Sequence, residues 1–171
     1  MDKVNLGRIE VIYRPDAADQ SSQVSSGSVH KIWPQPISPS EVESRVGFNI
    51  LRPGMHPWPG MQLVGVNAWV DPESDVSGIV SKYKANSAQW MAIRQTSIGR
   101  ASRSSVPYVL SEVKVGGQPA ALFRIIVPAS AHPGGQLTIV HLWWEYQDFF
   151  MNLESPQLSE QDLIQVAQSL S

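Results

Sequence analysis

The last third of the chain contains the feature that most limits the possible fold. Residues 137–146 read LTIVHLWWEY, a run of β-branched and aromatic side chains that favours a β-strand. Side chains alternate between the two faces of a strand. The more apolar face is expected in the core and consists of Thr138, Val140, Leu142, Trp144 and Tyr146. The pattern resumes at 149–153 after two polar residues, which predicts a hairpin.

A helix is predicted over residues 159–170, directly after this hairpin. Ser159 is a suitable N-cap because its hydroxyl can accept a free backbone N–H of the first turn. Glu160 and Asp162 place negative charge at the positive end of the helix dipole. An apolar stripe then follows at helical spacing, made of Leu163, Val166, Ala167 and Leu170. We expect this stripe to pack on the preceding sheet.

The middle of the chain predicts one short helix and several strands. Ser38, Pro39 and Glu41 form a capped helix start, and Gly47 is a natural stop, so a helix is expected over residues 39–46. Strands are predicted near residues 7–14, 61–71, 77–85 and 89–97, whereas residues 97–107 are small and polar and predict a loop. The clearest hairpin joins 109–115 to 118–127 through Gly116 and Gly117, which suit a type I′ turn.

These elements define an α+β fold. Short connections favour antiparallel pairing, because parallel crossovers need a dozen or more residues. The prediction is a curved antiparallel sheet of about seven strands, with a short N-terminal helix and a C-terminal helix packed on one face. Residues 16–28 have almost nothing to bury, so residues 1–28 are interpreted as an N-terminal arm and polar linker. Residues 29–171 are then a single domain.

Composition excludes some classes of protein. The 171 residues carry a net charge of −2, which gives no reason to expect a nucleic-acid partner. No stretch approaches the roughly 20 apolar residues that span a bilayer, and the N-terminus has no signal-peptide core. Cysteine is absent, which excludes disulfides and thiol catalysis. A complete chain of this kind is expected in the cytoplasm by default, whereas a piece of a membrane-anchored protein is not.

The order of motifs resembles the DUF4367 family over residues 29–171. The similarity rests on a short helix, an "x-V-x-G-G-x-P-A" hairpin, a strand with two tryptophans and a terminal helix. Its matching residues are Val46, Gly47, Phe48, Leu51, Arg52, Pro53, Gly54, Val113, Val115, Gly116, Pro119, Ala120, Trp143, Trp144, Glu145, Leu158, Ser159, Ala167, Ser169 and Leu170. This resemblance implies the extracytoplasmic part of a bacterial, anti-sigma-factor-like regulator. A more remote similarity is to the C-terminal domain of periplasmic regulators that bind anti-sigma factors.

No catalytic, cofactor or metal site is predicted. The four histidines, His30, His56, His132 and His141, are far apart and lack the spacing of a zinc site. Two Ser-x-x-Lys matches, at residues 28–31 and 111–114, lack the helix start that the β-lactamase-type motif needs. Lys82, Lys84, Arg100 and Arg103 could form a basic patch, although a solvated face is the favoured interpretation.

The candidate partner-binding surface has two parts. His141, Trp143 and Glu145 share the strand face opposite the expected core, where an exposed tryptophan between ionisable groups could anchor a partner. His56 and Trp58 lie in a proline-rich segment, where prolines lower the entropy lost on binding. In each case the alternative is that the tryptophan is covered and serves packing.

Two functions are favoured over a third, an enzyme of unknown type, which clustered titratable residues in a cleft would indicate. The first is a non-enzymatic regulatory or sensory protein-interaction domain, the soluble extracytoplasmic part of a bacterial envelope-associated regulator. The second is a binding module for a lipid or other apolar ligand held between the sheet and its helices. An enclosed apolar cavity between the sheet and the terminal helix would favour the second, whereas a solid core with Trp58 or Trp143 exposed would favour the first.

Overall fold

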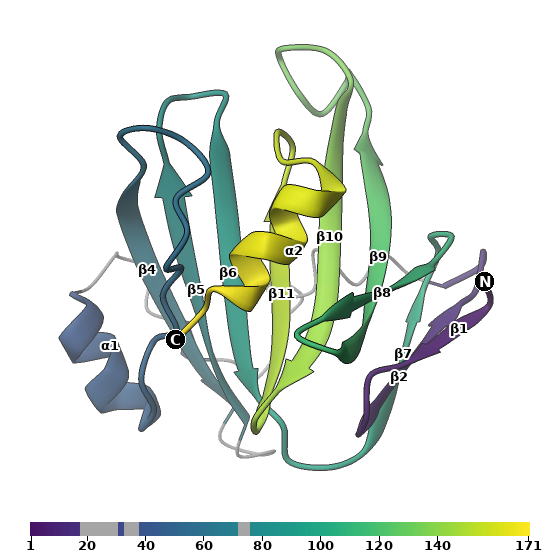
Figure 1. Ribbon diagram of the computed structural model, residues 1–171, viewed down its shortest axis with the longest axis horizontal. Helices are drawn as coiled ribbons and strands as arrows, with labels where there is room; N and C mark the ends of the chain where they lie inside the picture. Colours follow the sequence, from purple (N-terminus) through teal and green to yellow (C-terminus); the bar gives the residue numbers. More distant parts are fainter. Residues whose placement is uncertain (18–30, 33–37, 72–75) are drawn as a thin grey trace.

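The computed structural model (Figure 1) describes residues 1–17, 31–32, 38–71 and 76–171. Within these residues the main element is an open, fully antiparallel sheet with the strand order β3-β4-β5-β6-β11-β10-β9-β8. Its strands are β3 (Lys31–Ile32), β4 (Gln62–Asp71), β5 (Val76–Lys84), β6 (Trp90–Ser97), β8 (Ser111–Val115), β9 (Gln118–Val127), β10 (Leu137–Tyr146) and β11 (Phe149–Ser155). One of these eight strands, β3, has only two residues. The prediction of an antiparallel sheet of about seven strands with two helices is therefore confirmed. The prediction that the sheet is curved is wrong, since the sheet is neither curved nor closed.

The predicted C-terminal hairpin is present as β10 and β11, in the middle of this sheet. Leu142 pairs with Leu153, and Trp144 pairs with Met151. The turn contains no glycine, and Gln147 instead adopts the left-handed region with φ 54°. The pairing of two long apolar strands outweighs the cost of a non-glycine residue in this conformation, which is on the order of 1 kcal/mol.

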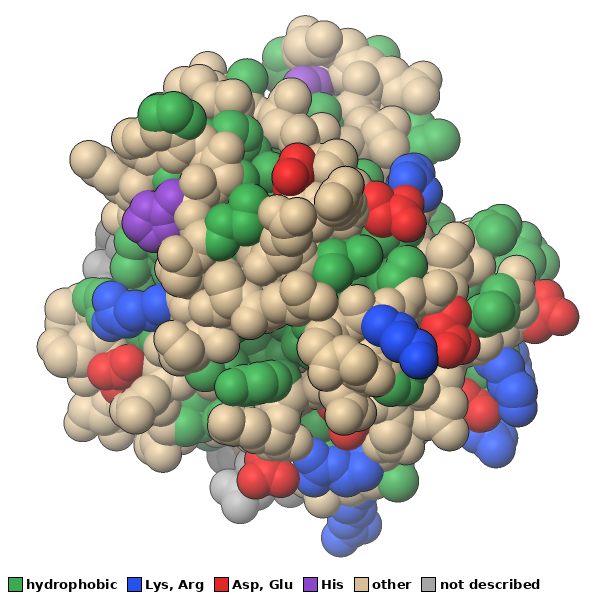
Figure 2. Space-filling model, in the orientation of Figure 1, with side chains coloured by type: hydrophobic (Ala, Val, Ile, Leu, Met, Phe, Trp, Pro, Cys, Tyr) green, Lys and Arg blue, Asp and Glu red, His purple; other side chains and the backbone are tan. Residues whose placement is uncertain are grey.

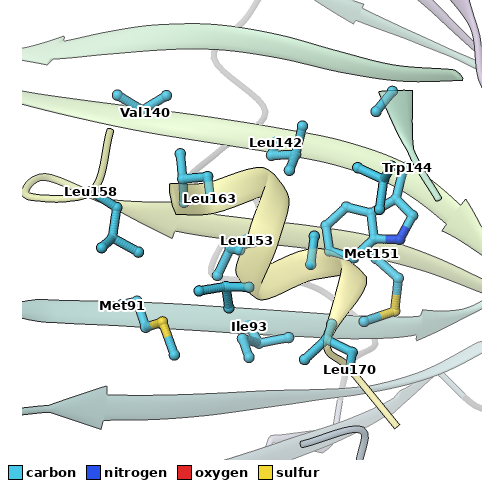
Figure 3. Close-up of a cluster of buried hydrophobic side chains, with 14 of the residues drawn as sticks. Met91, Ile93, Val140, Leu142, Trp144, Met151, Leu153, Leu158, Leu163 and Leu170 are labelled. Atoms are coloured by element: carbon cyan, nitrogen blue, oxygen red, sulfur yellow. The ribbon is translucent and has the colours of Figure 1, made fainter. Parts of the chain in front are cut away.

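Helix α2 (Glu160–Gln168) begins as predicted, with the Ser159 hydroxyl accepting the backbone N–H of Asp162 at 3.1 Å. Its apolar stripe is fully buried at Leu163 and Val166. Figure 3 shows this helix lying across β10, β11 and β6, with Leu163 beside Leu142 and Leu153. We call the side of the sheet that carries Leu142 and Trp144 the helix face.

Helix α1 (Pro39–Val46) is also capped as predicted, by Ser38 at its start and by Gly47, with φ 81°, at its end. Val42 is fully buried against the edge of the sheet near β4 and β5, in a cluster with Val66, Ala68 and Ile79. By strand register these residues face the same way as Leu142. Both helices therefore contact the helix face.

A second, three-stranded sheet covers the other side, which we call the N-terminal face. It contains β1 (Lys3–Asn5), β2 (Ile9–Tyr13) and β7 (Ser102–Val106), in the order β1-β2-β7. The loop predicted over residues 97–107 is therefore wrong in part, and β7 pairs with β2 in parallel rather than antiparallel. Ser102 to Ser105 carry no apolar alternation that would reveal a strand. Their pairing depends on β2, far away in the sequence.

The first two strands, from the segment interpreted as an N-terminal arm, belong to this layer. Val4, Leu6, Ile9 and Val11 are buried in a cluster with Phe123 and Trp143 of the large sheet. Phe123 and Trp143 alternate in direction with Leu122 and Leu142, so this cluster lies on the side opposite α2. The polar linker is predicted over residues 16–28, and its part from residue 18 onward lies outside the residues that the structure describes.

Candidate functional site

The carboxylate of Glu145 binds the turn between β1 and β2. Its Oε1 accepts the backbone N–H of Ile9 at 2.7 Å, and its Oε2 lies 3.7 Å from Nε of Arg8. Gly7 adopts φ 133°, and a Cβ there would lie 2.8 Å from the carboxylate, so this close approach requires glycine. Glu145 therefore holds the small sheet against the large one.

His141 is buried on the N-terminal face, with 2% of its surface exposed. Its Nδ1 lies 3.3 Å from Oδ1 of Asn152 and 3.3 Å from Oε2 of Glu154. The ring stacks on Phe123 with centroids 5.2 Å apart, and Glu154 in turn lies 3.8 Å from Nη2 of Arg94. His141 is thus one member of a polar cluster on neighbouring strands β10, β11 and β6.

Trp143 is covered rather than exposed. Only 5% of its surface is exposed, because β1, β2 and β7 cover this part of the sheet. Its ring makes edge-to-face contacts with Phe123 at 4.9 Å and with Phe150 at 5.2 Å between centroids. The alternative of a covered packing residue holds, although the cover is the N-terminal sheet rather than a helix or the proline-rich loop.

The proline-rich segment places His56 and Trp58 on the other side of the molecule. Trp58 is buried in the main cluster of the helix face, whereas His56 is exposed. Backbone hydrogen bonds in both directions join Arg52 to Ser171, and the Ser169 hydroxyl accepts the N–H of Met55 at 3.0 Å. The segment is therefore fixed to the C-terminus beyond α2, and Trp58 is a packing residue.

The sheet separates the two groups of candidates. His141, Trp143 and Glu145 share the N-terminal face, and Trp58 lies on the helix face. The structure brings together only the first three, which form no exposed surface around Trp143. His30 lies outside the described residues, and His132 bonds locally to the carbonyl oxygen of Gly135 at 2.9 Å.

A pocket that sequence reasoning missed lies between the two sheets. Its volume is about 650 Å³. The large sheet contributes residues from β5, β6 and β11, the small sheet contributes β2 and β7, and the connection between β6 and β7 closes one side. The lining residues are Ile9, Val76, Thr96, Ser97, Ile98, Gly99, Arg100, Ser102, Ser104 and Phe150.

The lining combines an apolar part with hydroxyl groups and one charge. Ile9, Val76, Ile98 and Phe150 provide aliphatic and aromatic surface, and Thr96, Ser102 and Ser104 provide hydroxyls. Arg100 is the charged member of the described lining. The sequence carried no signal for the pocket, because the small polar residues at 99–105 predict only a loop until β7 is placed beside β2.

The charges near the pocket belong mostly to ion pairs. Arg8 lies near Glu145 and Asp148, and Nε of Arg103 lies 3.1 Å from Glu10. In the view of Figure 2, which has α2 in front, side chains of both signs are interspersed rather than sorted. Arg103 was expected on a solvated face, and its side chain is indeed exposed while it pairs with Glu10.

Burial changes the titration of one tyrosine on the helix face. Tyr83 is 6% exposed, and desolvation raises the pKa of its phenol, an effect that nearby Arg52 partly opposes. This residue belongs to the main apolar cluster and not to the pocket.

Within the described ranges, no group of three or more His, Cys, Asp or Glu side chains is placed to hold a metal ion. The match at residues 111–114 to Ser-x-x-Lys lies in strand β8, not at a helix start. Among the residues with described positions, no helix has the length and apolar character needed to cross a membrane.

The chain was compared with protein-family models, with curated proteins and with solved structures, and none of the three comparisons finds a match.

Proposed function

We propose that this chain is a non-enzymatic, sensory binding domain that takes a small, mainly apolar ligand in the pocket between its two sheets. The observation that carries the proposal is the pocket itself. Its volume of about 650 Å³ falls within the range of small-molecule sites in proteins.

The position of the pocket differs from the one expected for an apolar ligand. Between α2 and the large sheet, Leu163, Val166, Leu142 and Leu153 form a single buried cluster, and side chains fill this space (Figure 3). On the N-terminal face, the apolar surface of Ile9 and Phe150 borders the pocket. A ligand that covers these side chains would gain from the burial of apolar area.

Calorimetric titration with decanol tests this proposal. Decanol is neutral apart from one hydroxyl, so its binding reports mainly the apolar part of the pocket. We expect saturable binding of one molecule per chain. Thr96→Trp should abolish this binding, because Thr96 lines the pocket and the larger ring would fill it.

Thr138→Trp is the matched control. Thr138 also lies in a strand of the large sheet but is exposed and outside the lining. This variant should bind decanol as the wild-type chain does. Absence of saturable binding, or an equal loss in both variants, would rule out the pocket as the ligand site.

A second candidate function is protein interaction at the edge of the large sheet that β8 forms among the described strands. Strand β8 is the last strand in the order, and the neighbouring Val109 is 66% exposed. Edge strands offer unpaired backbone groups to a partner strand. Partner capture that is lost in Val109→Glu but kept in Ile126→Glu, at another exposed aliphatic, would support this function. Equal capture by both variants would contradict it.

The resemblance to DUF4367 supports an extracytoplasmic, bacterial setting as part of an envelope-associated regulator. A reporter enzyme that is active only outside the cytoplasm, fused to the gene product in its host, tests this setting. We expect an active fusion. An inactive fusion of normal abundance would instead place the chain in the cytoplasm.

A further inference from the structure

We infer that the ligand of the inter-sheet pocket is an amphipathic anion, such as a medium-chain carboxylate, whose head group binds Arg100. This inference rests on the proposed function, because it specifies the ligand class of the same pocket. The tail would lie along the apolar residues, and the charged group would remain at the exposed side.

The charge distribution around the pocket supports an anion. Among the lining residues that the structure describes, Arg100 is the one charged residue and none is acidic. Arg100 is exposed and makes no ion pair or hydrogen bond within the described part of the chain. The nearby Arg103 differs, because its guanidinium already lies 3.1 Å from Glu10. Arg100 is therefore the cation that is available to a ligand.

The hydroxyl groups of the lining add suitable donors. Ser102 and Ser104 stand in β7, and Thr96 stands in β6, so hydroxyls come from both sheets. Ser97 is already engaged, because its hydroxyl accepts the N–H of Ser77 at 3.0 Å and donates to the Ser77 carbonyl at 3.2 Å. A carboxylate accepts hydrogen bonds from both hydroxyl and guanidinium groups.

The apolar part argues against a small inorganic anion. Ile9, Val76, Ile98 and Phe150 would gain nothing from phosphate or sulfate, whereas an alkyl chain buries their surface. One cation next to this apolar surface fits a ligand with one anionic end and one hydrocarbon end. An arginine also binds a carboxylate in a bidentate geometry that a lysine cannot reproduce.

The test compares decanoate with decanol by calorimetric titration of the full chain, below the concentration at which decanoate forms micelles. The two probes share a chain length and differ in the charge of the head group. For the wild-type chain we expect decanoate to bind more tightly. Arg100→Gln should weaken decanoate binding about tenfold, the size of one charge-assisted contact at an accessible site, and leave decanol unchanged.

Arg103→Gln is the matched control, since it removes a nearby exposed arginine, in β7, that lies outside the pocket lining. This variant should bind both decanoate and decanol as the wild-type chain does. Rising salt should weaken decanoate binding and not decanol binding, because exposed charges are screened.

The outcomes separate the two proposals. Binding of neither probe to the wild-type chain would overturn the proposed function together with this inference. Binding of both probes with no selective loss in Arg100→Gln would overturn the anionic head group alone. An equal loss of decanoate affinity in Arg100→Gln and Arg103→Gln would also overturn the anionic head group, because a general effect of surface charge would then explain both losses.

Discussion

On its helix face the large sheet packs against α2 and α1, whereas on its N-terminal face it packs against the small sheet. The helix face forms a continuous apolar cluster that includes Leu142, Met151 and Leu163, all fully buried (Figure 3). The N-terminal face mixes an aromatic cluster with the polar groups of His141, Glu154 and Arg94. It also leaves the pocket between the two sheets.

This difference shows how one sheet can separate stability from binding. A helix with an apolar stripe can fill the space above a sheet closely, because side chains from both elements interdigitate. The small sheet is held at one end by Glu145 and by its buried aliphatic side chains. Near the connection between β6 and β7 it does not close the space, and small residues such as Gly99 and Ser102 leave the pocket.

The largest effect is expected from Leu163→Ala, which tests the packing of the helix face. Leu163 is fully buried between α2 and the sheet, so its truncation leaves a cavity. We expect the free energy of unfolding to fall by about 3 kcal/mol, measured by urea denaturation. The control Gln165→Ala, on the exposed side of α2, should change it by less than about 0.5 kcal/mol. Similar losses in the two variants would mean that α2 does not depend on its apolar stripe.

An intermediate effect is expected from Glu145→Ala, which tests the attachment of the small sheet. The variant leaves the N–H of Ile9 without its acceptor and removes the contact with Arg8. We expect a loss of about 1–2 kcal/mol and faster amide hydrogen exchange in β1 and β2 than in β10 and β11.

Glu145→Gln provides the matched comparison, because its amide oxygen can still accept the hydrogen bond from Ile9. It should restore most of the protection of β1 and β2. Uniform exchange changes across both sheets in the alanine variant would contradict a local attachment.

The smallest effect on the free energy of unfolding near neutral pH is expected from Tyr83→Phe, on the helix face. Burial raises its pKa, so the folded protein favours the neutral phenol more than the unfolded chain does. The associated stability is fully present below the usual phenol pKa of about 10 and is lost as the pH rises through the higher pKa of the folded state. Tyr83→Phe should therefore flatten the alkaline decline in unfolding free energy. If the unfolding free energy fell equally with rising pH in the wild-type chain and in Tyr83→Phe, Tyr83 would not contribute to the alkaline decline.

Much of the helix face was predictable because its signals are local. Ser159 and Ser38 cap their helices as expected, and the apolar spacing of Leu163 and Val166 indicated the buried side of α2. The strands of the C-terminal hairpin were also expected, including the core position of Trp144.

The candidate surface was less predictable, because exposure depends on what lies above a strand. The alternation of residues placed Trp143 and Glu145 on the strand face opposite Leu142 and Trp144, and both lie on that face, which carries a buried cluster of its own. It did not reveal that Val4 and Val11 would cover that side. His56, in contrast, is exposed beside a buried Trp58, because the segment is fixed through backbone bonds to the C-terminus.

The sequence by itself determined the two capped helices and the hairpins β8–β9 and β10–β11, because caps, turns and periodic patterns act between residues close together in the chain. Only the tertiary structure decided the parallel pairing of β2 with β7, the burial of Trp143 and the pocket beside Arg100. Each of these joins segments that are far apart in the sequence. Ser102 to Ser105 become a strand because the edge of β2 supplies hydrogen-bond partners, which no local pattern of these residues encodes.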